Sequence, residues 1–299
     1  MAADLFHADA EFRALVQRAG EHVGVDLAKI CLRGPEKMLR CTAYLQPLLV
    51  AVSLGYLRHL TGHGVTADVL LGHSLGEITA LGAGGVVSVE DAVLMAAKRG
   101  QLMEAVAGRV HGGMLAVTTA HRERVLQLVD GLQVVLANDN TPQQFVLSGE
   151  LVVLERIARQ ISQDQLGRSQ LLPVNGPWHS PFMAAARTEF ATWVVRLNFQ
   201  VPRVPLILNA TGTAETDPAT IKRHVIDTLA GPVQWRRCLE CLRAMQPRQL
   251  YEIGPGRVLS GLARANGFGF ETRVWNINNL RGIQSAITLP AAEKIDPIA

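Results

Sequence analysis

Apolar residues recur at helical spacing through the first hundred positions of the chain. The spacing predicts helices over 8–32, 41–60 and 89–108, of which the second is the more deeply buried. Between them, a short apolar run at 69–71 predicts a strand, and a glycine-containing turn separates it from helix-forming residues at 77–85. The pattern therefore predicts a strand, a tight turn and a helix placed among longer helices.

The pattern changes at residue 112 and takes the order β-α-β-β-α-β. The predicted strands lie at 112–120, 132–140, 143–150 and 169–175, and the helices at 121–131 and 151–163. This order is the ferredoxin-like pattern, and it predicts a subdomain over 112–175 inserted into a larger α/β domain formed by 1–111 and 176–285. Within 176–285 we expect a further helix and two strands, at 181–197, 205–210 and 249–255. We expect 286–299 to be a loose tail.

Composition limits the classes of protein to which the chain can belong. Apolar residues make up 48% and charged residues 18%, which is enough for a buried core and argues against disorder. The formal charge of +3 is too small to suggest a nucleic-acid-binding protein, but it is compatible with an anionic ligand or an acidic partner. There is no run of about 20 apolar residues and no signal peptide, so we expect a cytoplasmic protein without a membrane span.

The four cysteines do not form the pattern of a disulfide framework. Cys238 and Cys241 have C-x-x-C spacing, but they lie in "QWRRCLECLRAM", which has the pattern of a helix. A zinc or redox site would need further ligands nearby. We therefore predict that these cysteines pack in a helix in a reducing compartment, and we expect no metal site.

The segment "LLGHSLGE" is the first candidate for chemistry. Residues 72–76 fit G-x-S-x-G, in which glycines permit a sharp strand-to-helix turn that exposes the serine oxygen. The helix that follows points its N-terminal N–H groups at charge that develops near that oxygen. A chance match is the alternative, but the flanking strand and helix are the context that the motif needs. We predict that Ser74 is a nucleophile.

The base that would activate Ser74 is predicted at His179, one of nine histidines. It follows a strand and a Gly-Pro turn and precedes a helix, where a loop can present a side chain to a cleft between domains. A histidine at a helix N-terminus without chemistry is the alternative. Acids between the two positions, Asp130, Asp139 and Asp164, lie in the predicted subdomain and have no strand-end setting in the main body. We therefore predict a serine–histidine dyad whose imidazole is oriented by a backbone carbonyl.

Five segments occur in the order "GHSLGE", "KRGQLM", "PWHSPFM", "GPVQW" and "YEIGPGRVL". In these segments and their spacing, the chain resembles the malonyl-CoA:acyl carrier protein transacylases. That family includes the acyltransferase domains of polyketide synthases. The resemblance extends from about Asp4 to about Ser285. It implies an α/β fold with an α/β-hydrolase-like large domain and an inserted ferredoxin-like subdomain.

The resemblance also implies a role for particular residues. Ser74 matches the acylated nucleophile and His179 its general base. Arg99 matches the arginine that binds the free carboxylate of the malonyl group, for which a planar bidentate guanidinium is suited. The backbone N–H of Leu75 is expected in the oxyanion hole, and the main-chain carbonyl of Gln234 is expected to hold the histidine ring. Without the resemblance, Arg99 would be taken for an exposed helix residue.

Three further residues are expected to line the cleft. Gln46, in "YLQPLL", and Asn140 match polar residues of the family, and Asn138 is a second candidate for the role of Asn140. The alternative for both asparagines is a turn at the end of a strand. The residues before His179, Gly176-Pro177-Trp178, do not match the usual malonyl or methylmalonyl signatures, but the bulk of Trp178 would crowd an α-methyl branch and so favours malonyl.

One part of the family pattern is missing from this sequence. Family members begin with a strand and a "PGQGSQ" loop whose first glutamine supplies a backbone N–H to the oxyanion hole, whereas this sequence opens "MAADLF". We interpret this as a start assigned too late. The alternative is a chain that lacks half of its oxyanion hole, and the loss of one such donor costs about a hundred- to a thousandfold in rate.

The function implied is an acyltransferase that moves a malonyl group from CoA, through a seryl ester, to the phosphopantetheine thiol of an acyl carrier protein. The expected partners are malonyl-CoA and the carrier protein, the chain is expected to be a monomer, and no cofactor is expected. One alternative is a hydrolase that clears acyl groups from carrier proteins, against which Arg99 argues. Another is a catalytically impaired relative that only binds the carrier protein. The sequence does not distinguish fatty-acid from polyketide synthesis.

Overall fold

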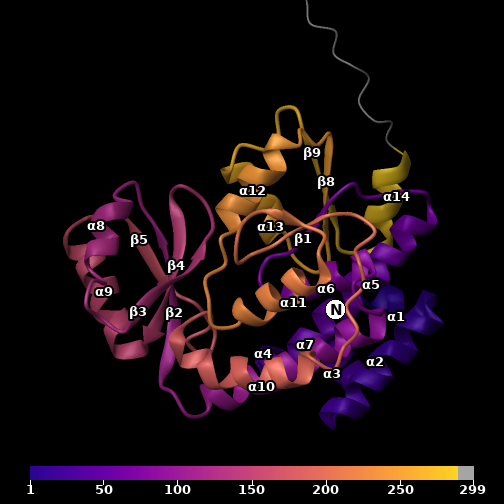
Figure 1. Cartoon of the computed structure of the whole chain (residues 1–299), viewed down its shortest axis with the longest axis horizontal. Helices are drawn as coiled ribbons and strands as arrows, with labels where there is room; N and C mark the ends of the chain where they lie inside the picture. Colours follow the sequence, from indigo (N-terminus) through magenta and orange to yellow (C-terminus); the bar gives the residue numbers. More distant parts are fainter. Residues whose placement is uncertain (289–299) are drawn as a thin grey trace, which may run out of the picture.

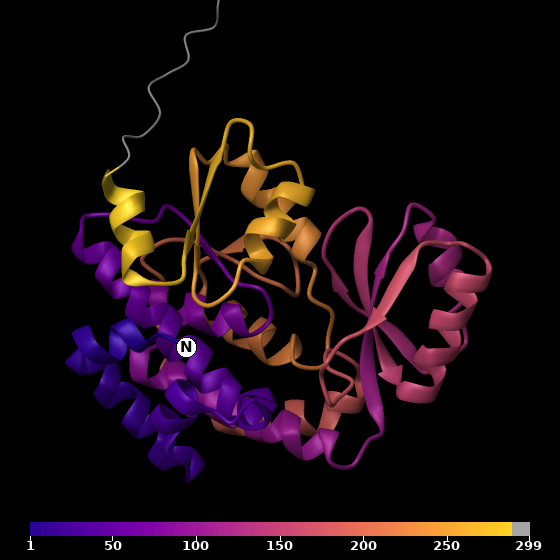
Figure 2. The same ribbon diagram turned by 180° about the vertical axis from the view of Figure 1, so that it is seen from behind.

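The structure is a computed structural model that describes residues 1–288. A large α/β body and a smaller domain, made of one sheet covered by helices, lie beside each other (Figure 1). The view from behind shows the same two parts (Figure 2). None of the helices among the described residues is long and apolar enough to span a lipid bilayer.

The first part of the chain forms a helical layer. Its elements are α1 (Ala3–Ala8), α2 (Ala10–Val23), α3 (Leu27–Arg33), α4 (Glu36–Arg40) and α5 (Thr42–Gly62). The helix predicted over 8–32 is two helices, because Gly24 at φ 72° ends α2 and the Asp26 side chain caps α3. The helix α5, whose side chains are mostly buried, packs against α7 (Val89–Ala107).

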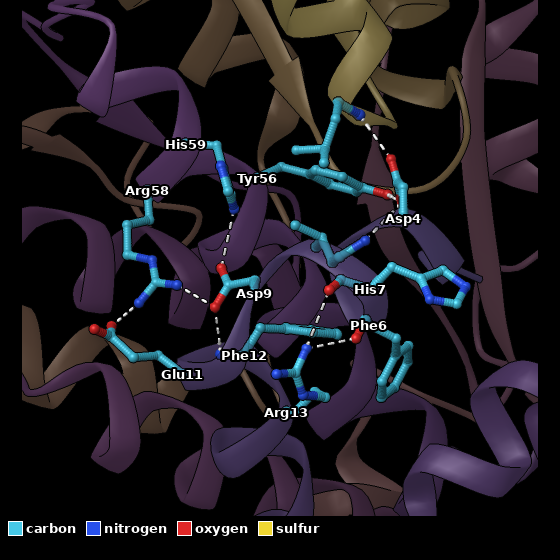
Figure 3. A network of polar contacts seen from close by, with 12 residues as sticks. Asp4, Phe6, His7, Asp9, Glu11, Phe12, Arg13, Tyr56, Arg58 and His59 are labelled. Atoms are coloured by element: carbon cyan, nitrogen blue, oxygen red, sulfur yellow. Dashed lines mark hydrogen bonds and ion pairs between the residues drawn. The ribbon is translucent and has the colours of Figure 1, made fainter.

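A network of polar contacts fastens the N-terminal helices to α5 (Figure 3). The buried carboxylate of Asp9 caps α2 by accepting the Phe12 N–H at 2.8 Å, and it also contacts Arg58 and His59 of α5. Asp4 accepts the Tyr56 hydroxyl at 2.8 Å and the Leu280 N–H at 2.7 Å. Because Leu280 begins α14 (Leu280–Thr288), this carboxylate joins the two ends of the described chain.

The strands of the large body form two separate groups. The strand β1 (Leu70–Leu71) pairs in parallel with β6 (Leu206–Ile207), which pairs antiparallel with β7 (Ala214–Glu215). The strand β8 (Gln249–Ile253) pairs in parallel with β9 (Arg273–Ile277). The remaining elements are α6 (Leu75–Gly84), the 3₁₀ helix η1 (Pro181–Met183), α10 (Ala184–Val194), α11 (Pro218–Asp227), α12 (Trp235–Ala244) and α13 (Val258–Ala265).

The smaller domain contains β2 (Gly112–Thr118), α8 (Arg122–Gln127), β3 (Val134–Asp139), β4 (Gln144–Glu150), α9 (Leu151–Gln163) and β5 (Arg168–Leu171). Its antiparallel sheet has the strand order β3-β4-β2-β5, which is the order of a ferredoxin-like sheet. Apolar residues of the sheet and both helices form a core of their own, separate from the core of the large body.

The tail predicted at 286–299 begins too early. The helix α14 continues to Thr288, and Ala286 is buried against the body. Its apolar positions, Ile283 and Ala286, are three residues apart and so lie on one face, which docks onto the large domain. The rest of the predicted tail, 289–299, lies outside the described residues.

Candidate active site

Ser74 lies at the turn between β1 and α6. Its backbone has φ 52° and ψ −106°, a conformation that non-glycine residues rarely adopt and that persists where the surroundings enforce it. A Cβ at Gly72 would lie 2.0 Å from the carbonyl group of Gly76, so only glycine fits there. The second glycine of the motif is different, because a Cβ at Gly76 would meet no atom within 4 Å. The turn therefore depends on Gly72.

The side chain of Asn209 holds this turn in place. It follows β6, the strand beside β1, and is completely buried. Its Oδ1 accepts the Ser74 N–H at 2.7 Å, and its Nδ2 donates to the carbonyl of Gly72 at 2.7 Å. One carboxamide therefore satisfies a donor and an acceptor of the strained turn.

His179 is the partner of Ser74. Its Nε2 lies 2.7 Å from Ser74 Oγ, and its side chain is 3% exposed. Its Nδ1 lies 2.8 Å from the carbonyl oxygen of Thr228 and 3.2 Å from that of Gly231. Carbonyl oxygens only accept, so Nδ1 carries the proton and Nε2 is free to accept the serine hydroxyl proton. Burial, together with the positive charge of Arg99, lowers the pKa of His179 to about 3, so the imidazole is neutral at pH 7.

The prediction that the Gln234 carbonyl holds this ring is wrong. The carbonyls at Nδ1 belong to Thr228 and Gly231, in the segment that follows α11. Gln234 instead donates its backbone N–H to the Asn209 carbonyl at 2.9 Å and its side-chain amide to the Ala210 carbonyl. The physical reason is that α11 ends close to the ring, so the carbonyl of its C-cap residue Thr228 and that of Gly231, in the turn that follows, reach Nδ1.

Arg99 approaches Ser74 from α7. It is 6% exposed, and its guanidinium donates to Ser74 Oγ at 3.1 Å and to Gln46 Oε1 at 2.7 Å. Gln46 is buried in α5 and also contacts Thr42 and Met103. The expectation from local pattern alone, an exposed helix residue, is therefore wrong for Arg99. Gln46 therefore binds one terminal nitrogen of a buried cation whose other terminal nitrogen donates to the serine oxygen.

Glu77 is the acidic residue whose charge acts on the Arg99 guanidinium. It is 3% exposed in α6, and its Oε1 accepts the Asn209 N–H at 2.7 Å. Burial raises the pKa of Glu77 to about 7, although the Asn209 N–H and Arg99 act against the rise. Burial likewise lowers the pKa of Arg99 to about 10, so the guanidinium stays charged at pH 7. Because its pKa is raised, the Glu77 carboxyl only partly offsets the positive charge of Arg99 at neutral pH.

Several backbone N–H groups at the start of α6 already have hydrogen-bond acceptors. The N–H of Ser74 is taken by Asn209, that of Gly76 by the His73 carbonyl at 2.9 Å, and that of Glu77 by the Ser74 carbonyl at 3.1 Å. The N–H of Leu75, the helix donor next to Ser74, takes part in none of these three bonds. This assignment supports the prediction of Leu75 as an oxyanion donor without testing it.

The predicted cleft residues lie in two different places. Asn140 is buried at the end of the smaller domain's hairpin, where its Oδ1 accepts from His73 Nε2 at 2.9 Å. Asn138 lies at a bulge in β3 and forms a parallel bridge with Val233. Trp178 is 8% exposed and packs over Gly176 in the main core. Asn140 therefore ties the serine turn to the smaller domain, and control of the acyl branch by Trp178 stays a prediction.

The two cysteines of the C-x-x-C segment lie in α12. Cys238 is buried and donates its thiol to the Leu208 carbonyl at 3.4 Å, and Cys241 is half-buried. Burial raises the pKa of the Cys238 thiol well above its ordinary value. The thiol is therefore protonated and unreactive at neutral pH.

Sequence reasoning missed Asn209, Glu77 and Thr228. The signal for Asn209 was its place after the strand "PLIL", because the carboxyl ends of neighbouring parallel strands meet at one edge of a sheet. Glu77 was a single acid in an otherwise apolar helix. Thr228 acts through its backbone carbonyl, so its residue type carried no signal.

These residues together define a class of protein. A serine is held by hydrogen bonds to a neutral, carbonyl-oriented histidine and to a buried arginine, at the end of a parallel strand in an α/β body. This is the arrangement of an enzyme that forms an acyl ester on serine, and the arginine places a positive charge beside the serine oxygen.

The comparisons with known proteins name the family. The model of the acyl transferase domain matches residues 1–265. The malonyl CoA-acyl carrier protein transacylase of Bacillus subtilis is 32% identical over 269 residues, which are 88% of this chain and 85% of that protein. The polyketide biosynthesis protein ThaF of Burkholderia thailandensis is 32% identical over 265 residues, and the chain spans 23% of its length. The chain belongs to the acyl transferase domain family, and it is an acyltransferase.

Solved structures agree with this assignment. The malonyl-CoA:acyl carrier protein transacylase of Xanthomonas oryzae matches with a TM-score of 0.88 and 31% identity, over 95% of this chain and 91% of that one. A type II polyketide synthase carrier protein in complex with its malonyl-transacylase matches with a TM-score of 0.87 and 29% identity, over 95% of this chain and 93% of that one. The likeness confirms the predicted fold class, an α/β-hydrolase-like large domain with a ferredoxin-like subdomain.

Proposed function

We propose that the chain transfers a malonyl group from CoA to the phosphopantetheine thiol of an acyl carrier protein, by way of an ester on Ser74. The observation that carries the proposal is the position of Ser74 Oγ, 2.7 Å from His179 Nε2 and 3.1 Å from the Arg99 guanidinium. The first contact activates the oxygen. The second places a cation beside the acyl group that the oxygen will carry.

The first half of the reaction loads the serine. Ser74 Oγ attacks the thioester carbonyl of malonyl-CoA while His179 Nε2 takes the hydroxyl proton. The tetrahedral oxyanion is stabilised by the Leu75 N–H at the start of α6. The C–S bond then breaks, CoA leaves as a thiol with the proton from His179, and the malonyl group remains on Ser74.

The second half runs the same steps with another thiol. The phosphopantetheine thiol gives its proton to His179 and attacks the ester carbonyl, the C–O bond breaks, and Ser74 Oγ regains a proton from His179. Arg99 holds the free malonyl carboxylate in both halves, since a bidentate charge-assisted contact suits a carboxylate. Relatives named as malonyl transacylases, and one solved with its carrier protein, support this choice of acyl group and partner.

Ser74, His179 and Arg99 all come from one chain, so one protomer supplies all three, and we expect a monomer to be active. The relatives include transacylases with and without polyketide biosynthesis in their names, so the proposal stops at the carrier protein's thiol.

The test follows a labelled malonyl group. The protein is incubated with malonyl-CoA, freed of excess substrate, and divided between buffer and buffer with holo carrier protein. We expect label on the carrier protein and little free malonate, no loading in Ser74→Ala, and normal loading in the exposed control Ser285→Ala. Release of malonate at the same rate in both halves would show a hydrolase and contradict the proposal.

A further inference from the structure

Glu104 lies on α7, the helix that also carries Arg99, and its carboxylate contacts two other segments beside the active site. Its Oε2 accepts the backbone N–H of Thr42 at 3.0 Å. Its Oε1 accepts the side-chain amide of Asn175 at 2.7 Å, in the segment that leads to His179. The contact with Thr42 is partly buried, whereas that with Asn175 is exposed, so the first is the better shielded from water.

The contact with Glu104 holds the first turn of α5. Thr42 is the first residue of this helix, so its N–H is one of the donors that a helix N-terminus leaves without an intrahelical partner. A carboxylate is a favoured acceptor at this end, because the helix dipole places partial positive charge there. Glu104 supplies that acceptor from the neighbouring helix.

The two helices meet at Gly100, which follows Arg99 directly. A Cβ at Gly100 would lie 2.5 Å from the Thr42 carbonyl oxygen, so glycine lets the first turn of α5 approach α7. Residues four apart on a helix share a face, so Gly100 and Glu104 both face this turn. The start of α5 is therefore fixed against the part of α7 that carries Arg99.

From Thr42 a chain of hydrogen bonds leads to the nucleophile. Gln46 Nε2 donates to Thr42 Oγ1 at 2.6 Å, and Gln46 Oε1 accepts from Arg99 Nη1 at 2.7 Å. Arg99 Nη2 donates in turn to Ser74 Oγ at 3.1 Å. A guanidinium only donates, so the carboxamide of Gln46 must turn its oxygen to Arg99 and its nitrogen to the Thr42 hydroxyl. The Thr42 hydroxyl thus orients the group that holds Arg99.

We infer that Glu104 is a positioning residue for the selection of the acyl group. It fixes Thr42, Thr42 orients Gln46, and Gln46 sets the Arg99 guanidinium beside Ser74 Oγ. The inference rests on the proposed function, in which Arg99 binds the free carboxylate of the malonyl group. Because Glu104 acts through Arg99, its loss should slow the loading of an acyl group with a free carboxylate more than that of an acyl group without one.

The test compares loading of the protein by malonyl-CoA and by acetyl-CoA, which has no free carboxylate. In Glu104→Ala we expect kcat/KM to fall about tenfold for malonyl-CoA and less than about threefold for acetyl-CoA. Glu104→Gln keeps an oxygen that accepts the Thr42 N–H, and it should keep both values within about twofold of the wild type.

Two matched controls separate this effect from a general loss of structure. Asn175→Ala removes the other contact of the same carboxylate, and it should leave the ratio of the two kcat/KM values unchanged. Glu123→Ala changes an exposed glutamate of α8, in the smaller domain, and it should change neither value. Melting temperatures show which variants are folded.

Two further variants test the route through Arg99. Thr42→Val keeps the backbone N–H and removes the hydroxyl, so it should show the same selective fall for malonyl-CoA, and it carries the test if Glu104→Ala does not fold. The double variant Glu104→Ala/Arg99→Ala should load malonyl-CoA no more slowly than Arg99→Ala alone, because changes that act through one group are not additive.

Labelling of Ser74 by a fluorophosphonate distinguishes this inference from the proposed function, because the reaction needs no malonyl group. Glu104→Ala should shift the labelling rate in the same direction as Arg99→Ala, and the double variant should react at the rate of Arg99→Ala. A wild-type protein that malonyl-CoA does not load would contradict the proposed function and leave this comparison intact.

Four results would overturn the inference. The first is an equal fall for both thioesters in Glu104→Ala, which would make the residue merely structural. The second is wild-type selectivity in Thr42→Val. The third is a loss in Glu104→Gln as large as that in Glu104→Ala. The fourth is additive losses in the double variant, in loading or in labelling.

Discussion

Asn209 Oδ1 accepts the backbone N–H of Ser74 at 2.7 Å, although the two residues are 135 positions apart in the chain. Through this contact the strand β6 holds the strained turn that presents the nucleophile. The Ser74 N–H is consequently engaged and is not available to a developing oxyanion. At this turn His179 and Arg99 contact the side-chain oxygen of Ser74, whereas Asn209 contacts its backbone.

Replacing Asn209 with alanine should damage both the stability and the reactivity of the turn. The change leaves the Ser74 N–H and the Gly72 carbonyl without partners, at about 1–3 kcal/mol for each buried group. We expect a lower free energy of unfolding in urea and labelling of Ser74 by a fluorophosphonate at least about tenfold slower. The exposed control Asn198→Ala should change neither quantity. Labelling at the wild-type rate in Asn209→Ala would show that the turn holds without this side chain.

The two glycines of the motif should respond differently to alanine. At Gly72 the added Cβ would overlap the Gly76 carbonyl, and overpacking of this kind costs about 1–3 kcal/mol or more. At Gly76 there is room, and alanine favours a helix over glycine by up to about 1 kcal/mol. Melting temperatures should therefore fall in Gly72→Ala and hold or rise in Gly76→Ala. Equal destabilisation of the two variants would contradict the geometry of the turn.

Arg99→Ala should change the selectivity for the acyl group more than the rate of the acyl-transfer step itself. Loss of a charge-assisted contact costs about 1.5–3 kcal/mol, or roughly 10- to 100-fold in kcat/KM for malonyl-CoA. Acetyl-CoA has no free carboxylate, so its loading should fall far less. Arg99→Lys keeps the charge without the planar fork and should be intermediate. Loading rates with both thioesters measure the ratio, and an equal fall for both would assign Arg99 to Ser74 alone.

The rate of loading should be insensitive to pH in the range where histidine ordinarily titrates. The pKa of His179 is lowered to about 3 by burial and by Arg99, so the imidazole stays neutral as the pH falls through 6.5. We expect kcat/KM for malonyl-CoA to change less than about twofold from pH 7.5 to pH 5.5. A proportional fall in rate below pH 6.5 would contradict this expectation.

Two controls accompany this profile. At His179 the folded state binds fewer protons than the unfolded chain, so the stability that this residue contributes is lost as the pH falls from 6.5 toward 3, and the folded fraction must be measured at each pH. Glu77, whose pKa is raised to about 7, titrates within the same range. Glu77→Gln removes that titration, and its loading profile should be as flat as that of the wild type.

The fold class was predictable because its signals are local. Short apolar segments separated by helical patterns predicted β2 to β5, and the ferredoxin-like order followed from the order of elements alone. The break at Gly24 and the helix α14 were missed. The break at Gly24 depends on the left-handed conformation of that particular glycine. The helix α14 is stabilised by docking onto the body, which includes a contact with Asp4 at the far end of the chain.

The candidate site was only partly predictable for the same reason. Ser74, His179 and Arg99 lie in motifs that the sequence displays, and the structure brings them within hydrogen-bonding distance. The orienting carbonyl was misplaced at Gln234 because any residue can supply a carbonyl, so only the position of the backbone decides which one does. Asn209 was missed because its contacts join segments that are distant in the chain.

The central claim is that Ser74 carries the malonyl group. The most direct measurement is the intact mass of the protein, and of its proteolytic peptides, after brief mixing with malonyl-CoA. The account predicts a mass increase of one malonyl group on the peptide that contains Ser74, absent in Ser74→Ala and discharged by holo carrier protein. A malonyl adduct that persists in Ser74→Ala, or an unmodified wild-type protein that still transfers malonyl, would contradict it.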